Sequence, residues 1–170
     1  MREKTRYRLA MAGMISLNLV IMAPAVHMAA VNAKDTYIKQ EYVQYCEEIG
    51  AQYSISPELL EALIETESSG NAMATSDHGA VGLTQVIPKY SRYSMYELYQ
   101  PRTSIKAGAE ILVEFCEKYG DAGMALVAYN CGEYSRQFKE SLRTGELTGY
   151  ANKILDRAYE LEQIHGKHDS

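Results

Sequence analysis

Apolar residues recur at the spacing of an α-helix through most of the chain after its first 35 residues, whereas strand-like alternation is weak. The stretches with this spacing are 35–49, 57–68, 104–119, 121–128, 135–142 and 150–164. Ser56 and Pro57 form a typical helix start, and Asp121 is a typical helix cap. Gly50 and Gly120 stand where helices commonly end. The sequence therefore predicts a mainly α fold.

The segments between these helices differ in composition. Residues 69–82 are rich in Gly, Ser, Asn and Ala, which predicts a loop, and residues 90–101 form a tyrosine-rich connector. A short helix is expected over residues 83–87, ended by Pro88. With 170 residues, of which 46% are hydrophobic, the chain supports one domain with a substantial core but not two.

The first segment has the pattern of an export signal. Its start is basic, with Arg2, Lys4, Arg6 and Arg8, and residues 9–31 are largely apolar. Small residues at 31–33 suit a signal peptidase, but the apolar stretch is also long enough to span a bilayer. We therefore expect residues 1–33 to be a cleaved signal peptide or a retained membrane anchor. Residues 34–170, with a core at about 50–160, form the exported domain under either interpretation.

Charge and cysteine content exclude some classes of partner. The leader holds four basic residues and one acidic residue, which leaves 13 basic and 21 acidic residues and a net charge of −8. An acidic domain of this kind is a poor nucleic-acid binder. Cys46, Cys116 and Cys131 permit one disulfide and a free thiol, or three free thiols. No Cys-x-x-Cys spacing exists and the four histidines do not cluster with the cysteines, so no metal site is expected.

Glu67 is the strongest candidate for chemistry. Leu60, Leu63 and Ile64 form the inward stripe of the helix, and Glu67 continues it at i+7, i+4 and i+3, whereas Glu65 faces elsewhere, toward solvent. Loss of hydration on an apolar face raises the pKa of a carboxyl group, which can then donate a proton near neutral pH. The alternative is a glutamate near a fraying helix end that turns to solvent or pairs with a lysine.

Three motifs resemble one family of enzymes. Residues 67–88 read Glu-Ser-Ser-Gly-Asn-Ala-Met-Ala-Thr-Ser-Asp-His-Gly-Ala-Val-Gly-Leu-Thr-Gln-Val-Ile-Pro, and Ala128-Tyr129-Asn130-Cys131-Gly132 follows later. Glu146 with Gly149-Tyr150 forms the third motif, and Pro101, Ile105 and Gly108 match the linking helix. This order, across about residues 50–160, resembles the soluble lytic transglycosylase (SLT) family of the lysozyme-like superfamily.

The resemblance implies a single lysozyme-like α domain of the goose-type or lytic transglycosylase kind. It implies that Glu67 acts first as acid and then as base, without a metal or a cofactor. The residues that it places along the substrate cleft are Ser68, Ser76, Gln85, Tyr129, Asn130, Glu146 and Tyr150. From the residues alone, Ser76 is equally suited to capping a turn and Asn130 to bracing a loop.

Two positions depart from the family pattern. Thr84 stands where methionine is usual, so a weaker or more polar contact in the cleft is expected, and Cys131 replaces alanine.

The implied substrate is peptidoglycan, whose β-1,4 bond between N-acetylmuramic acid and N-acetylglucosamine is cleaved without water to give 1,6-anhydromuramic ends. The acetamido group of the substrate takes the place of the second carboxylate that ordinary glycosidases use.

Two other functions remain open at this point. One is a hydrolytic muramidase of the same fold, in which Asp77 helps to position water. The other is a glycan-binding assembly module without catalysis. The expected location is the cell envelope or the extracellular space, with the protein either free or anchored through residues 9–31. The expected biological role is wall remodelling, or opening of the wall for a secretion, conjugation or phage apparatus.

Overall fold

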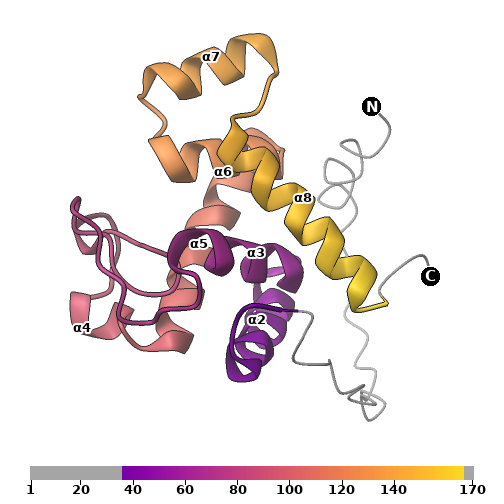
Figure 1. The fold of residues 1–170 in the computed structure, drawn as a ribbon. Coiled ribbons are helices and arrows are strands. Elements are labelled where there is room, and N and C mark those ends of the chain that lie inside the picture. Colours follow the sequence, from indigo (N-terminus) through magenta and orange to yellow (C-terminus); the bar gives the residue numbers. More distant parts are fainter. Residues whose placement is uncertain (1–35, 167–170) are drawn as a thin grey trace, which may run out of the picture.

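The computed structural model describes residues 36–166, and it is built from helices (Figure 1). The elements are α2 (Gln40–Tyr53), α3 (Pro57–Ser68), the 3-10 helix η1 (Pro88–Tyr90), α4 (Met95–Leu98), α5 (Pro101–Tyr119), α6 (Ala122–Cys131), α7 (Arg136–Thr144) and α8 (Gly149–Ile164). Within the described part of the chain, extended pairing is limited to two isolated bridges, Thr75 with Val81 and Val81 with Val86. The predicted mainly α fold is confirmed.

The expected leader, residues 1–33, lies outside the described residues. Among the helices of residues 36–166, none combines the length and the apolar character that crossing a membrane requires.

Helix α3 is the centre of the packing. It contacts α2, α5 and α8, and Figure 1 shows α8 lying along it. Leu60, Leu63 and Ile64 are completely buried in the main core, as the helical stripe predicts. Helix α6 packs against α5, α7 and α8, and its central residues are buried as well. Burial of each large apolar side chain contributes about 1.5–3 kcal/mol, so this core fixes the direction of α3 and of the carboxyl groups that it carries.

Several predicted helix ends are confirmed by their caps. The Ser56 hydroxyl accepts a hydrogen bond from the Leu59 N–H, and Pro57 occupies the first turn of α3. Asp121 accepts a bond of 2.9 Å from the Gly123 N–H at the start of α6. Gly120 ends α5 with a φ of 67°, a conformation that glycine adopts without steric cost.

The predicted helix end at Gly50 is wrong. Helix α2 begins at Gln40 rather than at residue 35, and it continues through Gly50 to Tyr53. The turn lies at Ser54, with a φ of 55°, and the Ile55 N–H then donates to the Gly50 carbonyl at 3.0 Å. A Cβ atom at residue 50 would stand 2.7 Å from the Ile55 carbonyl oxygen, so the glycine makes room for the returning chain.

The predicted short helix over residues 83–87 is also wrong. Val86 forms a bridge with Val81, and Gln85 between them has a φ of 51°, which is incompatible with a right-handed helix. The helical turn lies further on, as η1. The expected connector contains α4, which Ser94 and Glu97 begin through a reciprocal capping box.

Candidate active site

Glu67 lies in the last turn of α3, half-buried, beside the first turn of α8. The Tyr150 hydroxyl donates a hydrogen bond to its Oε1 atom. These two residues are 83 positions apart in the sequence, and the packing of α8 on α3 brings them together.

The surroundings of Glu67 shift its pKa in opposite directions. Burial, the largest effect, raises the pKa of Glu67 above the usual value for a glutamate. The hydrogen bond from Tyr150 and the positive charge of Lys153 each lower that pKa in part. The net shift is upward, so the carboxyl group keeps its proton to a higher pH than an exposed glutamate does. This arrangement suits a group that donates a proton first and must carry a negative charge afterwards.

Tyr129 adds a second phenol near this carboxyl group. Its hydroxyl donates to the Thr84 carbonyl at 2.6 Å. Burial, followed by the negative charge of Glu67, raises the pKa of Tyr129, and the same two causes raise the pKa of Tyr150. Both phenols therefore stay protonated and remain hydrogen-bond donors.

The Thr84 side chain lies outside any cleft, and its expected contact there is wrong. Thr84 is completely buried, and its hydroxyl donates to the Ser104 carbonyl at 2.6 Å. Gly108 permits this approach, because a Cβ atom there would stand 2.8 Å from the Cβ of Thr84. Hydrogen bonds from Thr84 to Ser104 therefore hold the loop against α5. They also position the backbone carbonyl of Thr84, which accepts the hydrogen bond from Tyr129.

Three other predicted site residues hold the loop that follows α3. The Ser68 hydroxyl donates to the Leu83 carbonyl at 2.8 Å. The Gln85 side-chain amide donates to the carbonyls of Ala74 and Gly82. The Ser76 hydroxyl accepts from the Ala80 N–H at 3.0 Å, which is the turn-capping alternative. In this geometry the three side chains shape the loop backbone beside Glu67.

Two predicted site residues stand further out. Asn130 is exposed at the end of α6. Glu146 is exposed before α8 and lines a hollow of about 440 Å³ together with residues of α7. Asp77, the candidate for positioning water, is exposed in the loop after α3. The residues that the structure gathers directly around Glu67 are thus Tyr150, Lys153 and Tyr129.

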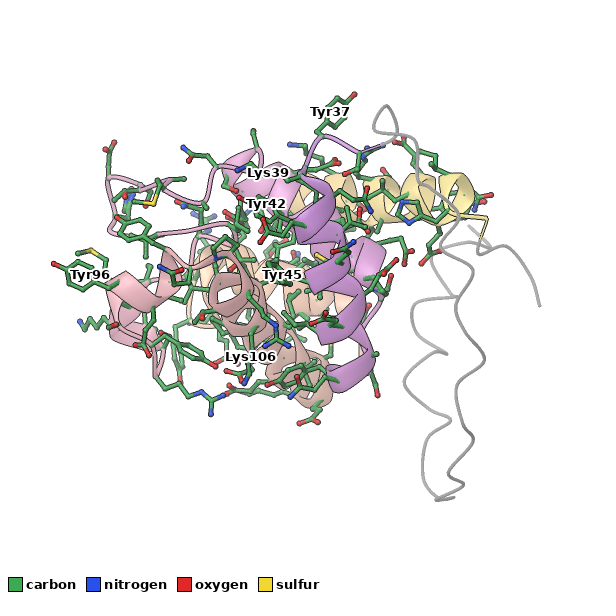
Figure 2. All side chains as sticks on the ribbon, turned by 90° about the horizontal axis from the view of Figure 1, so that it is seen from below. Tyr37, Lys39, Tyr42, Tyr45, Tyr96 and Lys106 are labelled. Atoms are coloured by element: carbon green, nitrogen blue, oxygen red, sulfur yellow. The ribbon has the colours of Figure 1, made fainter. Side chains whose placement is uncertain are left out.

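A hollow of about 760 Å³ lies at the junction of α3 and α8, and the motifs do not predict it. The residues that line it are Tyr37, Glu65, Thr66, Ser69, Lys153, Asp156, Arg157 and Glu160. Lys153 belongs both to this hollow and to the surroundings of Glu67. Tyr37, which is strongly exposed, projects from the surface of the molecule in Figure 2.

Glu65 is buried in an ion pair, so the expectation that it faces solvent is wrong. Its side chain is 9% exposed, and Arg157 of α8 contacts both of its oxygens, at 2.7 and 3.1 Å. Only the fold brings these residues together, since they stand 92 positions apart in the sequence. All three cysteines are free thiols, which is the second of the two arrangements that the sequence permits.

Comparisons with known proteins agree with the geometry. The sequence model of the family described as Transglycosylase SLT domain matches residues 44–148. A transglycosylase of Enterobacteria phage PRD1 is 40% identical over 94 residues, which are 53% of this chain and 36% of the phage protein. The endo-type membrane-bound lytic murein transglycosylase A of Klebsiella pneumoniae is 33% identical over 84 residues, which are 42% of this chain and 41% of that protein. The chain therefore spans less than half the length of these two relatives.

A third relative is covered more completely. Protein IpgF of Shigella sonnei is 31% identical over 108 residues, which are 57% of this chain and 71% of that protein.

Two solved structures share the fold. They are the 70 kDa soluble lytic transglycosylase of Escherichia coli (TM-score 0.61, 22% identity) and an inactive mutant of the lytic transglycosylase Slt of Pseudomonas aeruginosa (TM-score 0.60, 20% identity). The similarity covers 74% and 72% of this chain, respectively, and 24% of each of those chains. The match of the family model to more than half of the sequence, together with this fold, establishes that the chain belongs to the transglycosylase SLT domain family.

Proposed function

We propose that this protein is a peptidoglycan lytic transglycosylase, and that Glu67 is its single acid and base. The observation that carries the proposal is a half-buried carboxyl group with a raised pKa that also accepts a hydrogen bond from Tyr150. A carboxyl group in this state is suited to protonating the oxygen of a glycosidic bond. The family membership and the relatives named as lytic murein transglycosylases support the choice of glycan.

The first step breaks the bond between N-acetylmuramic acid and the next sugar. Glu67 gives its proton to the bridging oxygen, which leaves as a hydroxyl group with the electron pair of the C1–O bond. The acetamido oxygen of the muramic acid attacks C1 from the opposite side and supplies the electrons of the new bond. The substrate thus provides the nucleophile for which ordinary retaining glycosidases need a second carboxylate.

The second step closes the 1,6-anhydro ring. The ionised Glu67 removes the proton from the C6 hydroxyl, O6 attacks C1, and the bond to the acetamido oxygen breaks. Glu67 is protonated again at the end of the cycle. Tyr150 and Lys153 both favour the charged form of Glu67, so they stabilise it between the two proton transfers.

The remaining site residues are assigned to the substrate. We place Ser68, Ser76, Gln85 and Tyr129 along the glycan on one side of Glu67, because they belong to the loop after α3 or hold it in place. Asn130 and Glu146 are exposed where they could contact sugars further from the scissile bond. The hollow beside Lys153 is large enough to receive part of the glycan chain.

Export and the biological setting complete the proposal. Residues 1–33 act as a signal peptide or an anchor, which places the catalytic domain in the cell envelope or outside the cell. We propose that the protein opens the wall locally for a secretion, conjugation or phage apparatus. The similarity to a phage transglycosylase supports this role.

The decisive experiment is digestion of purified peptidoglycan by the full chain, solubilised in mild detergent, with the products weighed by mass spectrometry. We expect 1,6-anhydro ends, which are lighter by one water than the reducing ends of a hydrolase. Glu67→Gln keeps the size and the hydrogen bond to Tyr150 but cannot donate the proton, so we expect activity to fall by at least about 1000-fold.

The matched control is Glu47→Gln, an exposed glutamate on α2, which should retain full activity. Reducing ends instead of anhydro ends would identify a muramidase. Equal digestion by the wild type and by Glu67→Gln would contradict the role of Glu67, and no digestion by the wild type would favour a glycan-binding assembly module.

A further inference from the structure

A second group of ionisable side chains lies at the other end of α3. Glu58 and Glu61 stand one turn apart in the first half of that helix, and His165 follows the end of α8. Along the helix, Glu58 is roughly 13 Å from Glu67, given a rise of about 1.5 Å per residue. The cluster is therefore separate from the active site.

The ligand atoms of this cluster are spaced as around a small metal ion. The Nδ1 atom of His165 is 3.1 Å from Oε1 of Glu58 and 3.9 Å from Oε1 of Glu61. One ligand atom from each of the three residues lies within 4.8 Å of the others. Ligands about 2.0–2.2 Å from a tetrahedral zinc ion are roughly 3.3–3.6 Å apart, so small side-chain movements would close the site.

The three side chains are also held in place. Glu58 is 2% exposed and Glu61 is completely buried, and the Ser56 hydroxyl donates to Oε2 of Glu58 at 3.0 Å, which leaves Oε1 directed at the imidazole. Such a hydrogen bond to the outer atom of a ligand is typical of metal sites.

His165 supplies the nitrogen ligand of this group. Its side chain is only 7% exposed, and its Nδ1 atom is the ring nitrogen that faces both carboxylates. A buried imidazole nitrogen next to two buried carboxylates has the donor composition of a transition-metal site.

From this geometry we propose that Glu58, Glu61 and His165 bind one divalent transition-metal ion, with zinc preferred. Imidazole favours zinc over calcium and magnesium, which take oxygen ligands. The ion would join the first half of α3 to the end of α8. Its role is structural, because the ligands stand far from Glu67 and the proposed reaction uses no metal.

The test begins with the full chain, purified in mild detergent without a histidine tag and stripped with a chelator. After incubation with zinc chloride and gel filtration, elemental analysis should find about one zinc per chain. Zinc should also raise the melting temperature by several degrees, because an ion that binds only the folded state stabilises it. Magnesium at the same concentration should leave it unchanged.

Variants locate the site. His165→Asn and Glu61→Gln should each weaken zinc retention at least about 10-fold and remove the rise in melting temperature. The matched controls His78→Asn and Glu47→Gln change exposed residues and should behave like the wild type. Circular dichroism in the absence of zinc shows whether each variant is folded.

Two results would overturn the proposal. One is a wild-type chain that retains no zinc after gel filtration, which needs no variant to interpret. The other is a His165→Asn variant that retains as much zinc as the wild type, which would place the metal on other histidines of the chain. An equal rise in melting temperature with magnesium would contradict the preference for a transition metal.

Discussion

The hydroxyl of Tyr150 donates a hydrogen bond to the carboxyl group of Glu67, the proposed catalytic group. The contact favours the charged carboxylate, whereas burial favours the neutral acid. The two effects set the pH at which Glu67 loses its proton, and each can be changed separately.

Tyr150→Phe removes the hydrogen bond and keeps the ring. The pKa of Glu67 should rise further, because the bond lowers it in the wild type. As an acid, Glu67 is active while protonated, so the pH at which activity declines should move upward in the variant. The ring-closing step needs the carboxylate, and loss of a bond to it, worth about 1.5–3 kcal/mol, should lower the maximal rate roughly 10- to 100-fold. Rates of anhydro product formation across pH test this, and an unchanged profile would contradict it.

Glu67→Gln should make the fold more stable at neutral pH. The pKa of Glu67 is higher in the folded protein than in the unfolded chain, so the unfolded chain ionises first as pH rises. The wild type loses stability as pH rises from the unfolded to the folded pKa, and the loss is complete above both. The variant should therefore melt above the wild type at pH 8 and at about the same temperature at pH 3, as followed by circular dichroism. A variant less stable than the wild type at pH 8 would show that burial of the carboxyl group is not costly.

At the scale of helices, the contact of α5 with the loop depends on the missing side chain of Gly108. Gly108→Ala would place a Cβ atom 2.8 Å from the Cβ of Thr84 and should cost about 1–3 kcal/mol of stability by overpacking. The matched control is Gly149→Ala in the first turn of α8, where an added Cβ meets nothing within 4 Å. That change should be neutral or stabilise by up to about 1 kcal/mol. Urea denaturation of both variants measures the difference, and equal costs would contradict the proposed close contact.

The ion pair of Arg157 with Glu65 connects α8 to α3 from a largely buried position. Arg157→Ala should destabilise by about 2–3 kcal/mol, because it leaves a carboxylate in a poorly hydrated site. Arg143→Ala is the control, since the pair of Arg143 with Glu140 is well exposed and should contribute almost nothing to stability. The melting temperatures of the two variants test this prediction. Equally small losses of stability in both variants would show that the ion pair of Arg157 is not buried in solution.

Local patterns predicted those elements whose ends are set by neighbouring residues. Ser56, Pro57, Gly120 and Asp121 lie at helix ends as expected, because a cap or a stop acts through backbone atoms a few positions away. The prediction that Gly50 ends a helix was wrong, because this glycine leaves space for the Ile55 carbonyl, which a side chain would fill.

The candidate site was predictable to the extent that it lies on one helix. The position of Glu67 follows from its spacing to Leu63 and Ile64, and the importance of Tyr150 came only from the family resemblance. The partners Arg157 of Glu65 and His165 of Glu58 could not be found from periodicity, because α8 meets α3 only in the folded chain.

For the whole molecule, the three free thiols differ in access. Cys46 and Cys116 are buried, and burial raises the pKa of both thiols, that of Cys116 to about 11, whereas Cys131 is half-buried. Ellman's reagent should therefore label Cys131 first in the folded protein, and the other two only after denaturation. A reducing agent should leave the melting temperature unchanged, and a shift of several degrees would indicate a disulfide in solution.

Tyr150 and Lys153 both belong to α8, the last helix described, whereas the proposed acid, Glu67, lies on α3. A ribosome therefore makes Glu67 long before it makes Tyr150 and Lys153, which shift the pKa of Glu67. During synthesis, the unfinished chain therefore has the proposed acid but not the contacts that shift its pKa. The proposed activity would thus begin only after α8 has been made and has packed on α3, a delay that follows from the order of the helices.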